Sequence, residues 1–177
     1  MGIAGKSGQK ITPVVCDTGP VLHLMEAGLL HLLKEAGKIY IPNSVEAELV
    51  EISPQWGKER PRWITIVALT LNESKEAGSL FLSGLLDLGE AEAIMLSKRL
   101  KAKWLLTDDT EARMFAASLG IEVHGSLGIV LWSAATGHLS YSEAMEAIDR
   151  LSRTSLWISK HIISEAQKAL QKMFGKE

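Results

Sequence analysis

Acidic residues follow two short apolar runs of this sequence. TPVVC (residues 12–16) ends at Asp17, and WLLT (104–107) is followed by Asp108 and Asp109. Both runs have the composition of buried strands. In open α/β sheets, active sites form where the carboxyl ends of parallel strands meet. If both strands are central and parallel, the three carboxylates are expected at one edge of the sheet.

Two glutamates lie on predicted helices that could lean over the same edge. Glu48 is in the helix after the second predicted strand, and Glu90 follows the turn at residues 87–89. Clustered carboxylates repel and raise one another's pKa unless a cation lies among them. Oxygen ligands with few imidazoles suit Mg²⁺ or Mn²⁺. Such an ion polarises a phosphodiester and activates bound water, so the pattern predicts phosphoryl-transfer chemistry.

Each of these acids also has a structural interpretation. Asp17, and either Asp108 or Asp109, could cap the helix that follows it, because Asp is a favoured N-cap residue. Glu48 and Glu90, taken singly, are typical of solvated helix faces. The set of five, rather than any one member, favours a functional centre.

Other chemistries have little support in the sequence. The single cysteine, Cys16, lies in an apolar run and allows neither an internal disulfide nor a cysteine-built zinc site. The five histidines contain no pair at the spacing of a helical zinc site, and G-x-x-x-x-G-K-[ST], G-x-S-x-G and G-x-G-x-x-G motifs are absent. We therefore expect neither a His-based metal centre, nor P-loop hydrolysis, nor dinucleotide redox chemistry.

Length and composition predict one globular domain. The 177 residues are 46% hydrophobic, which is enough for a sizeable core. The net charge of −2 does not indicate a general nucleic-acid binder, so binding would need a local basic patch. Neither a signal-peptide pattern nor a membrane-spanning run occurs in the sequence, which favours a cytoplasmic protein without a membrane partner.

Strand and helix patterns alternate along the chain. Strands are predicted at 12–16, 38–41, 63–69, 104–107 and 121–124, and helices at 20–35, 43–52, 73–86, 89–101, 110–119, 127–136, 142–152 and 161–174, with a loop at 53–62. This order predicts an α/β fold with helices on both faces of a parallel sheet. Asn43 and Glu46, and Ser140 and Glu143, are spaced as capping boxes. Residues 1–11 are expected to be a flexible N-terminus and 12–177 a single domain, with 138–177 as a C-terminal helical extension.

Five segments resemble, in order, the PIN-domain superfamily, and in particular a branch of small prokaryotic proteins akin to VapC-type toxins. They are VVCDTGPVLHL, IPNSVEAEL, LGEAEAIMLS, LLTDDTEAR and GSLGIVLWSAATG, between Val14 and about Ser159. The resemblance implies a three-layer α/β/α fold and Mg²⁺- or Mn²⁺-dependent hydrolysis of single-stranded RNA. It also implies that helices beyond Gly137 lie outside the usual catalytic core and serve a homodimer or a partner such as a small antitoxin.

The resemblance assigns roles to individual residues. It implies that Asp17 is the first acid, that Glu48 is the glutamate of a P-x-x-V-x-x-E-L pattern, and that Glu90 is the acid opening the central helix. Asp108 and Asp109 match the acids after a T-D-x or T-x-D strand end, and which of them binds the metal directly is left open. Many relatives have Ser or Thr followed by Ser or Asn after the first acid, where this chain has Thr-Gly. The hydroxyl groups expected to orient the metal-bound carboxylates are those of Thr18 and Thr107.

Basic residues supply two further expectations. Arg113, one helical turn after Asp109, could contact phosphate, but an ion pair with an acid is the expected role. A second hypothesis is an RNA-facing strip in the proline-rich loop, where aromatic rings could stack on bases, and the alternative is a solvated loop with Trp63 in the core. The strip contains Lys58, Arg60 and Arg62, interleaved with Trp56 and Trp63.

Two other functions compete with a ribonuclease that could be the toxin of a toxin–antitoxin pair. A haloacid-dehalogenase-like phosphohydrolase also uses a strand-end Asp, but it needs a second acid two positions later, where this chain has Gly19. A catalytically silent PIN-like module that binds RNA or a protein partner through the same cleft stays open.

Overall fold

Five parallel strands form one sheet in a computed structural model that describes residues 12–176 of the chain. The strands are β1 (Pro13–Cys16), β2 (Lys38–Pro42), β3 (Ile64–Val67), β4 (Trp104–Leu106) and β5 (Val123–His124), in the order β3-β2-β1-β4-β5. The flexible N-terminus expected at residues 1–11 lies outside the described residues.

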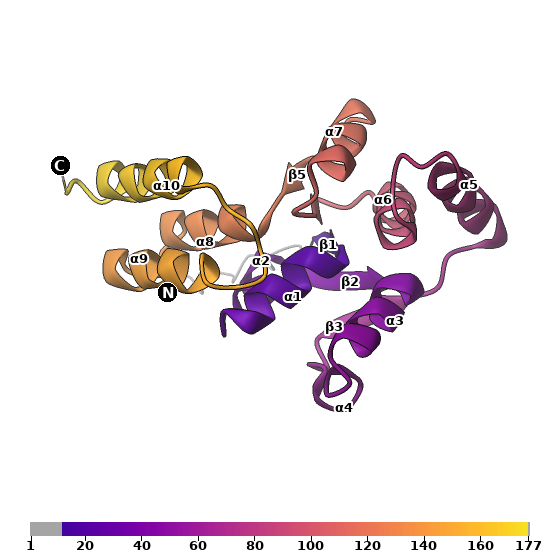
Figure 1. Cartoon of the computed structure of the whole chain (residues 1–177), viewed down its shortest axis with the longest axis horizontal. Coiled ribbons are helices and arrows are strands. Elements are labelled where there is room, and N and C mark those ends of the chain that lie inside the picture. Colours follow the sequence, from indigo (N-terminus) through magenta and orange to yellow (C-terminus); the bar gives the residue numbers. More distant parts are fainter. Residues whose placement is uncertain (1–11, 177) are drawn as a thin grey trace, which may run out of the picture.

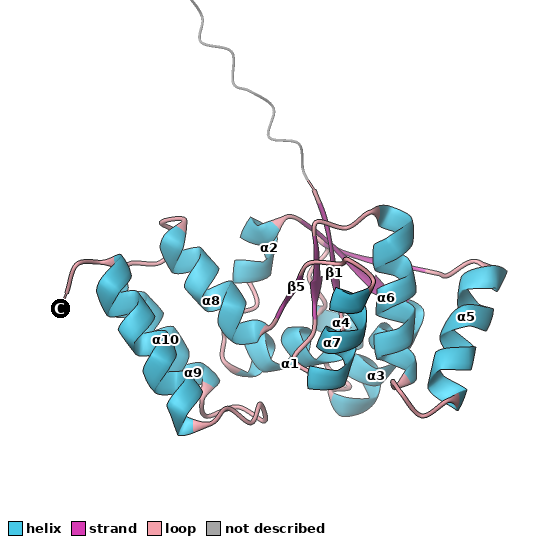
Figure 2. Cartoon of the chain, turned by 90° about the horizontal axis from the view of Figure 1, so that it is seen from above, coloured by secondary structure: helices cyan, strands magenta, loops and turns pink. Residues whose placement is uncertain are grey.

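Helices cover both faces of this sheet, which confirms the predicted three-layer α/β/α fold (Figures 1 and 2). Helices α2, α8, α9 and α10 lie on one side, and α5 and α6 on the other. The helices are α1 (Thr18–Glu26), α2 (Leu32–Ala36), α3 (Asn43–Ile52), α4 (Trp56–Glu59), α5 (Leu71–Leu82), α6 (Leu88–Leu100), α7 (Thr110–Ser118), α8 (Ser126–Ala135), α9 (Tyr141–Leu151) and α10 (Lys160–Met173).

The central strand β1 contributes side chains to two hydrophobic clusters, one on each face of the sheet. Val14 and Cys16 pack with α1, α2 and α8, while Val15 packs with α5, α6 and α7 on the opposite face. Successive side chains of a strand point to opposite faces, so a strand buried on both sides is apolar at every position. Cys16 is fully buried, as its apolar surroundings predict.

The strand order reverses between β1 and β4, which places their carboxyl ends side by side. The two strands pair from Val14 with Trp104 to Cys16 with Leu106, and the Asp17 N–H extends the ladder to the Leu106 carbonyl at 2.9 Å. Ligands of open α/β sheets bind at this switch point. The acids after β1 and β4 therefore flank it.

Three local features differ from the sequence-based expectations. The helix expected over 20–35 is two helices, because the chain turns at Gly28, whose φ of 68° favours glycine. The loop expected at 53–62 contains α4, held by the buried Trp56, whose indole N–H donates to Glu46 at 2.6 Å. Because Glu46 accepts this bond from Trp56, α3 begins at Asn43 without the predicted capping box between Asn43 and Glu46. The capping box of Ser140 with Glu143 is confirmed.

The C-terminal helices belong to the same hydrophobic core as the sheet. Ala144, Ile148 and Leu151 of α9 and Leu170 of α10 are fully buried in the cluster that contains Val14. Within residues 12–176, every helix is too short or too polar to cross a membrane.

Candidate active site

An open pocket at the carboxyl edge of the sheet contains the predicted acids. Six carboxylates line it, from the ends of β1 and β4, from α3 and from the start of α6: Asp17, Glu48, Asp87, Glu90, Asp108 and Asp109. Asp87 was not predicted as a site residue. The sequence feature that could have indicated Asp87 is the spacing Asp87-x-x-Glu90. This spacing forms a capping box that fixes both carboxylates at the first turn of α6.

Asp17 is the buried member of this cluster. Only 6% of its surface is exposed, and its two oxygens accept hydrogen bonds from the Thr18 N–H at 2.7 Å and the Thr107 hydroxyl at 3.0 Å. Burial raises the pKa of Asp17 to about 8, helped by the charges of Asp87 and Glu90 and opposed by these two hydrogen bonds. A carboxylate in this position is therefore strongly stabilised by a nearby cation.

Asp108 is held by groups far away in the sequence. His23 Nδ1 lies 2.7 Å from Asp108 Oδ2, which also accepts from the Ser126 hydroxyl at 2.6 Å, while the Ser126 N–H donates to Oδ1 at 2.7 Å. Asp108 thus ties β4 to α1 and α8. Neither His23 nor Ser126 was predicted for the site, because only the folded chain brings these two residues to Asp108.

Asp109 is more available than Asp108. Its Oδ1 caps α7 by accepting from the Ala112 N–H at 2.8 Å, and the residue is exposed at the pocket. Within residues 12–176, Asp109 Oδ2 accepts no hydrogen bond, whereas both Asp108 oxygens are engaged. Of the two acids that the sequence could not separate, Asp109 has the freer oxygen for a metal ion.

The two glutamates approach the pocket from α3 and α6. The Thr18 hydroxyl donates to Glu48 Oε2, and burial raises the Glu48 pKa. Glu90 accepts from the Asp87 N–H at 2.9 Å, and burial together with the charges of Asp87, Asp109 and Glu48 raises its pKa to about 7. The partial positive charge at helix N-termini, here those of α1, α6 and α7, offsets part of the acidic charge.

A glycine is required beside Asp108. A Cβ at Gly125 would lie 2.6 Å from Asp108 Oδ1 and 2.8 Å from Arg113 Nη1. We expect Gly125→Ala to displace these side chains and to lower the free energy of unfolding by about 1–3 kcal/mol, a loss of several degrees in Tm. Thermal denaturation measures this, with Gly78→Ala in α5 as the control, where a Cβ meets no atom within 4 Å. An equal Tm for the two variants would contradict the expectation.

A family model described as a PIN domain matches residues 13–172, which is most of the chain. The chain belongs to the PIN-domain family. The match continues through α9 into α10, so the C-terminal helices lie within this PIN domain as the family model defines it. PIN domains are in general metal-dependent nucleases, which agrees with the oxygen-rich pocket. A comparison with curated proteins finds no match.

The donor set of this PIN domain fits a hard divalent cation. The pocket offers carboxylates with a single imidazole, His23, and the raised pKa of Asp17 reflects a buried acid that lacks a compensating positive charge. Among the described residues, no three His, Cys, Asp or Glu side chains already form a compact metal-binding group. Mg²⁺ typically binds one or two protein carboxylates and keeps several waters, so it does not require three preformed protein ligands.

The other predicted residues of this PIN domain do not line the pocket. Arg113 forms no ion pair within residues 12–176, but its guanidinium lies near Asp108, because a Cβ at Gly125 would be 2.8 Å from Arg113 Nη1 and 2.6 Å from Asp108 Oδ1. Arg60 pairs with Glu46 in the first turn of α3, with its Nε 3.3 Å from Glu46 Oε1, and neither Arg60 nor Arg62 lines the pocket of the acids. The predicted RNA-facing role of Lys58, Arg60 and Arg62 stays a prediction, but Trp56 is buried and cannot stack on a base.

Proposed function

We propose that this protein is a metal-dependent endoribonuclease that hydrolyses single-stranded RNA in the cytoplasm. The observation that carries the proposal is the convergence of six carboxylates on one open pocket at the switch point of the sheet. A PIN-domain family match supports the nuclease class, while RNA as the substrate is part of the proposal.

Asp17, Glu90 and Asp109 are the residues that would hold Mg²⁺ or Mn²⁺, with Glu48 beside them. When bound, such an ion supplies charge stabilisation and water activation for phosphodiester hydrolysis. Thr107 and Thr18 orient Asp17 and Glu48 through their hydroxyl groups. Asp108 acts as a positioning residue, because its oxygens are occupied by His23 and Ser126.

Purified protein is expected to cleave a labelled single-stranded RNA when Mn²⁺ or Mg²⁺ is added and to stop when a chelator is present. A double-stranded RNA of the same sequence is the control substrate and is expected to be cleaved much more slowly. Gel electrophoresis of the products measures both. Cleavage that persists at equal rate in the chelator would contradict the metal dependence, because the pocket offers no other strong electrophile.

A catalytically silent PIN-like module is the second candidate. It is favoured by the structural roles of the acids: Asp87 and Glu90 form a capping box, and Asp109 caps α7. This candidate predicts RNA or protein binding without cleavage in any divalent metal. If the protein is the toxin of a toxin–antitoxin pair, a small antitoxin would cover the pocket. Co-expression of that antitoxin would then suppress cleavage.

A further inference from the structure

The loop between α9 and α10 displays an indole ring beside the acidic pocket. Trp157 is 85% exposed, whereas Trp56 is 2% exposed, and Leu82, at 83%, is the next most exposed of the large apolar side chains in the described part of the chain. Ser155, Leu156 and Trp157 all line the pocket that contains the six carboxylates. An exposed aromatic ring thus forms part of the rim of the candidate active site.

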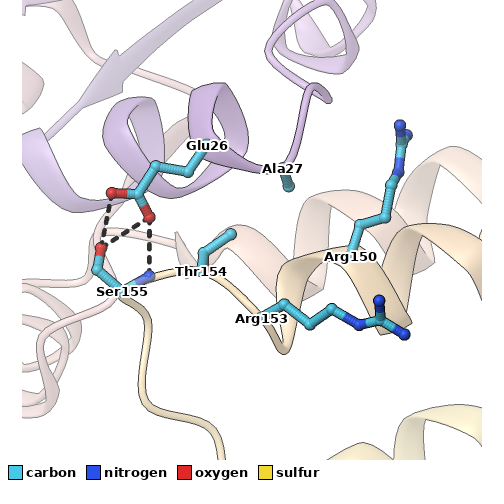
Figure 3. Close-up of a pocket in the computed structure, with 6 residues that line it drawn as sticks. All are labelled: Glu26, Ala27, Arg150, Arg153, Thr154 and Ser155. Atoms are coloured by element: carbon cyan, nitrogen blue, oxygen red, sulfur yellow. Dashed lines mark hydrogen bonds between the residues drawn. The ribbon is translucent and has the colours of Figure 1, made fainter.

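Contacts on both sides of Trp157 hold its loop in place. The Ser155 N–H and hydroxyl both donate to the Glu26 carboxylate at the end of α1, each at 2.8 Å to Oε2, as the dashed lines in Figure 3 show. Leu156 and Ile158, the two neighbours of Trp157, are partly buried against the core. The loop is therefore fixed to α1 and to the core, and a loop that is ordered before binding loses little backbone entropy when a ligand stacks on its exposed ring.

A second hollow continues from the same loop, on the far side of the Glu26–Ser155 contact. It is lined by Ala27, Thr154 and the side chains of Arg150 and Arg153, which extend away from that contact in Figure 3. Arg150 reaches toward the turn after α1, where a Cβ at Gly28 would lie 3.6 Å from its Nη1. Ser155 borders both hollows, so they are adjacent.

The two arginines have only weak partners on the surface. Arg153 lies 2.8 Å from Asp149 and Arg150 lies 4.0 Å from Glu146, and all four side chains are substantially exposed. Exposed ion pairs of one helix contribute little free energy, so a phosphate can replace the acid as partner. Helix α1 separates Asp17 from Glu26 by nine residues, or about 13 Å, which a short single strand can span.

We propose that this loop surface binds the single-stranded RNA next to the cleavage site, with one base stacked on Trp157 and phosphates held by Arg150 and Arg153. The proposal rests on the proposed function and names its substrate-binding subsite. Carboxylates in the pocket repel phosphates, so the strand needs contacts outside it. Stacking on Trp157 uses the uncharged face of a base. Arg150 and Arg153 would neutralise the phosphates of the RNA backbone on the other side of Ser155.

Binding of an oligouridylate of about eight nucleotides tests the stacking step. It is measured by fluorescence anisotropy with magnesium in an Asp17→Asn background, so that cleavage does not interfere. We expect Trp157→Ala and Trp157→Leu to weaken binding on the order of tenfold or more, and Trp157→Phe to retain most of it, because a base stacks on an aromatic ring. The matched control, Leu82→Ala, removes an equally exposed apolar side chain from the end of α5 and is expected to bind as the parent does.

The salt dependence tests the phosphate contacts. Loss of two contacts should reduce the slope of log K against log salt by about 1.4, at about 0.7 per phosphate of a single strand. We expect this for Arg150→Ala/Arg153→Ala and not for Lys75→Ala/Lys98→Ala, which removes the same charge from the α5–α6 flank. Equal slopes for the two double variants would overturn the phosphate contacts.

Failure of this proposal can be told from failure of the proposed function. If the wild type cleaves RNA and all Trp157 variants bind equally well, the subsite is wrong and the nuclease stands. If RNA binding depends on Trp157 while no metal supports cleavage, the subsite stands and the nuclease is wrong. If Trp157→Ala leaves RNA binding unchanged and converts a dimer to a monomer in analytical ultracentrifugation, the surface is an interface between copies, and the proposal is overturned.

Discussion

Replacing Asp17 with asparagine is expected to abolish metal-dependent RNA cleavage while the fold is retained. Asp17 is the buried acid of the pocket and has the most strongly raised carboxyl pKa in it. Loss of a residue that merely supports a metal ligand costs about 10- to 100-fold in affinity or activity, so loss of the ligand itself should cost at least about 100-fold. Gel-based cleavage assays with Mn²⁺ and Mg²⁺ measure the loss.

The asparagine variant should fold because it matches the hydrogen bonds of Asp17. Its amide oxygen can accept from the Thr18 N–H, and its amide N–H can donate to the Thr107 hydroxyl, which acts as donor or acceptor. A neutral amide also removes the free-energy cost of a buried charge. Glu51→Gln, on the exposed side of α3, is the control and should cleave normally. An Asp17→Asn protein that cleaves like the wild type would exclude Asp17 from the chemistry.

Without divalent metal, the wild type is expected to lose stability as the pH rises from about 4 to about 8. The pKa of Asp17 is about 8 in the folded protein and near 4 in the unfolded chain, so the folded state binds the extra proton between these values. Stability is therefore highest at the low end of this window and falls until Asp17 ionises near pH 8. Glu90, with a folded pKa of about 7, acts in the same direction. The total effect is on the order of a few kcal/mol.

Urea unfolding at pH 5 and pH 8, with chelator and with Mn²⁺, measures this dependence. The ion should stabilise the protein more at pH 8 than at pH 5, because a bound metal requires deprotonated carboxylates and protons compete with it. Asp17→Asn should show a weaker fall with pH and a smaller gain from Mn²⁺. A wild-type stability that rises between pH 5 and pH 8, or an equal response in the variant, would contradict the assignment of Asp17.

The raised pKa values and the proposed metal site have a common cause. Six acids around one pocket repel one another when no cation is present, and this repulsion lowers the stability of the folded state. Asp87 and Asp109 stay in the pocket because each caps a helix. Proteins retain such strain mainly at functional sites.

Much of the fold and part of the site could be predicted from local patterns. The strands before Asp17 and before Asp108 are short apolar runs, and such runs alternating with amphipathic helices determine a parallel sheet with acids at its carboxyl edge. The break at Gly28 and the short helix at Trp56 were missed, because one depends on a single left-handed residue and the other on a long-range hydrogen bond to Glu46.

Only the tertiary structure decided what surrounds each acid. His23 and Ser126 reach Asp108 across 85 and 18 residues of sequence, and this contact distinguishes Asp108 from Asp109, which the sequence could not do. Asp87 looks like an ordinary helix cap until α6 is placed beside β1. Trp157 reaches the same pocket because Ser155 binds Glu26, 129 residues earlier in the chain. Backbone periodicity determines strand ends locally, whereas side-chain partners, burial and pKa depend on contacts between distant segments, which exist only in the folded chain.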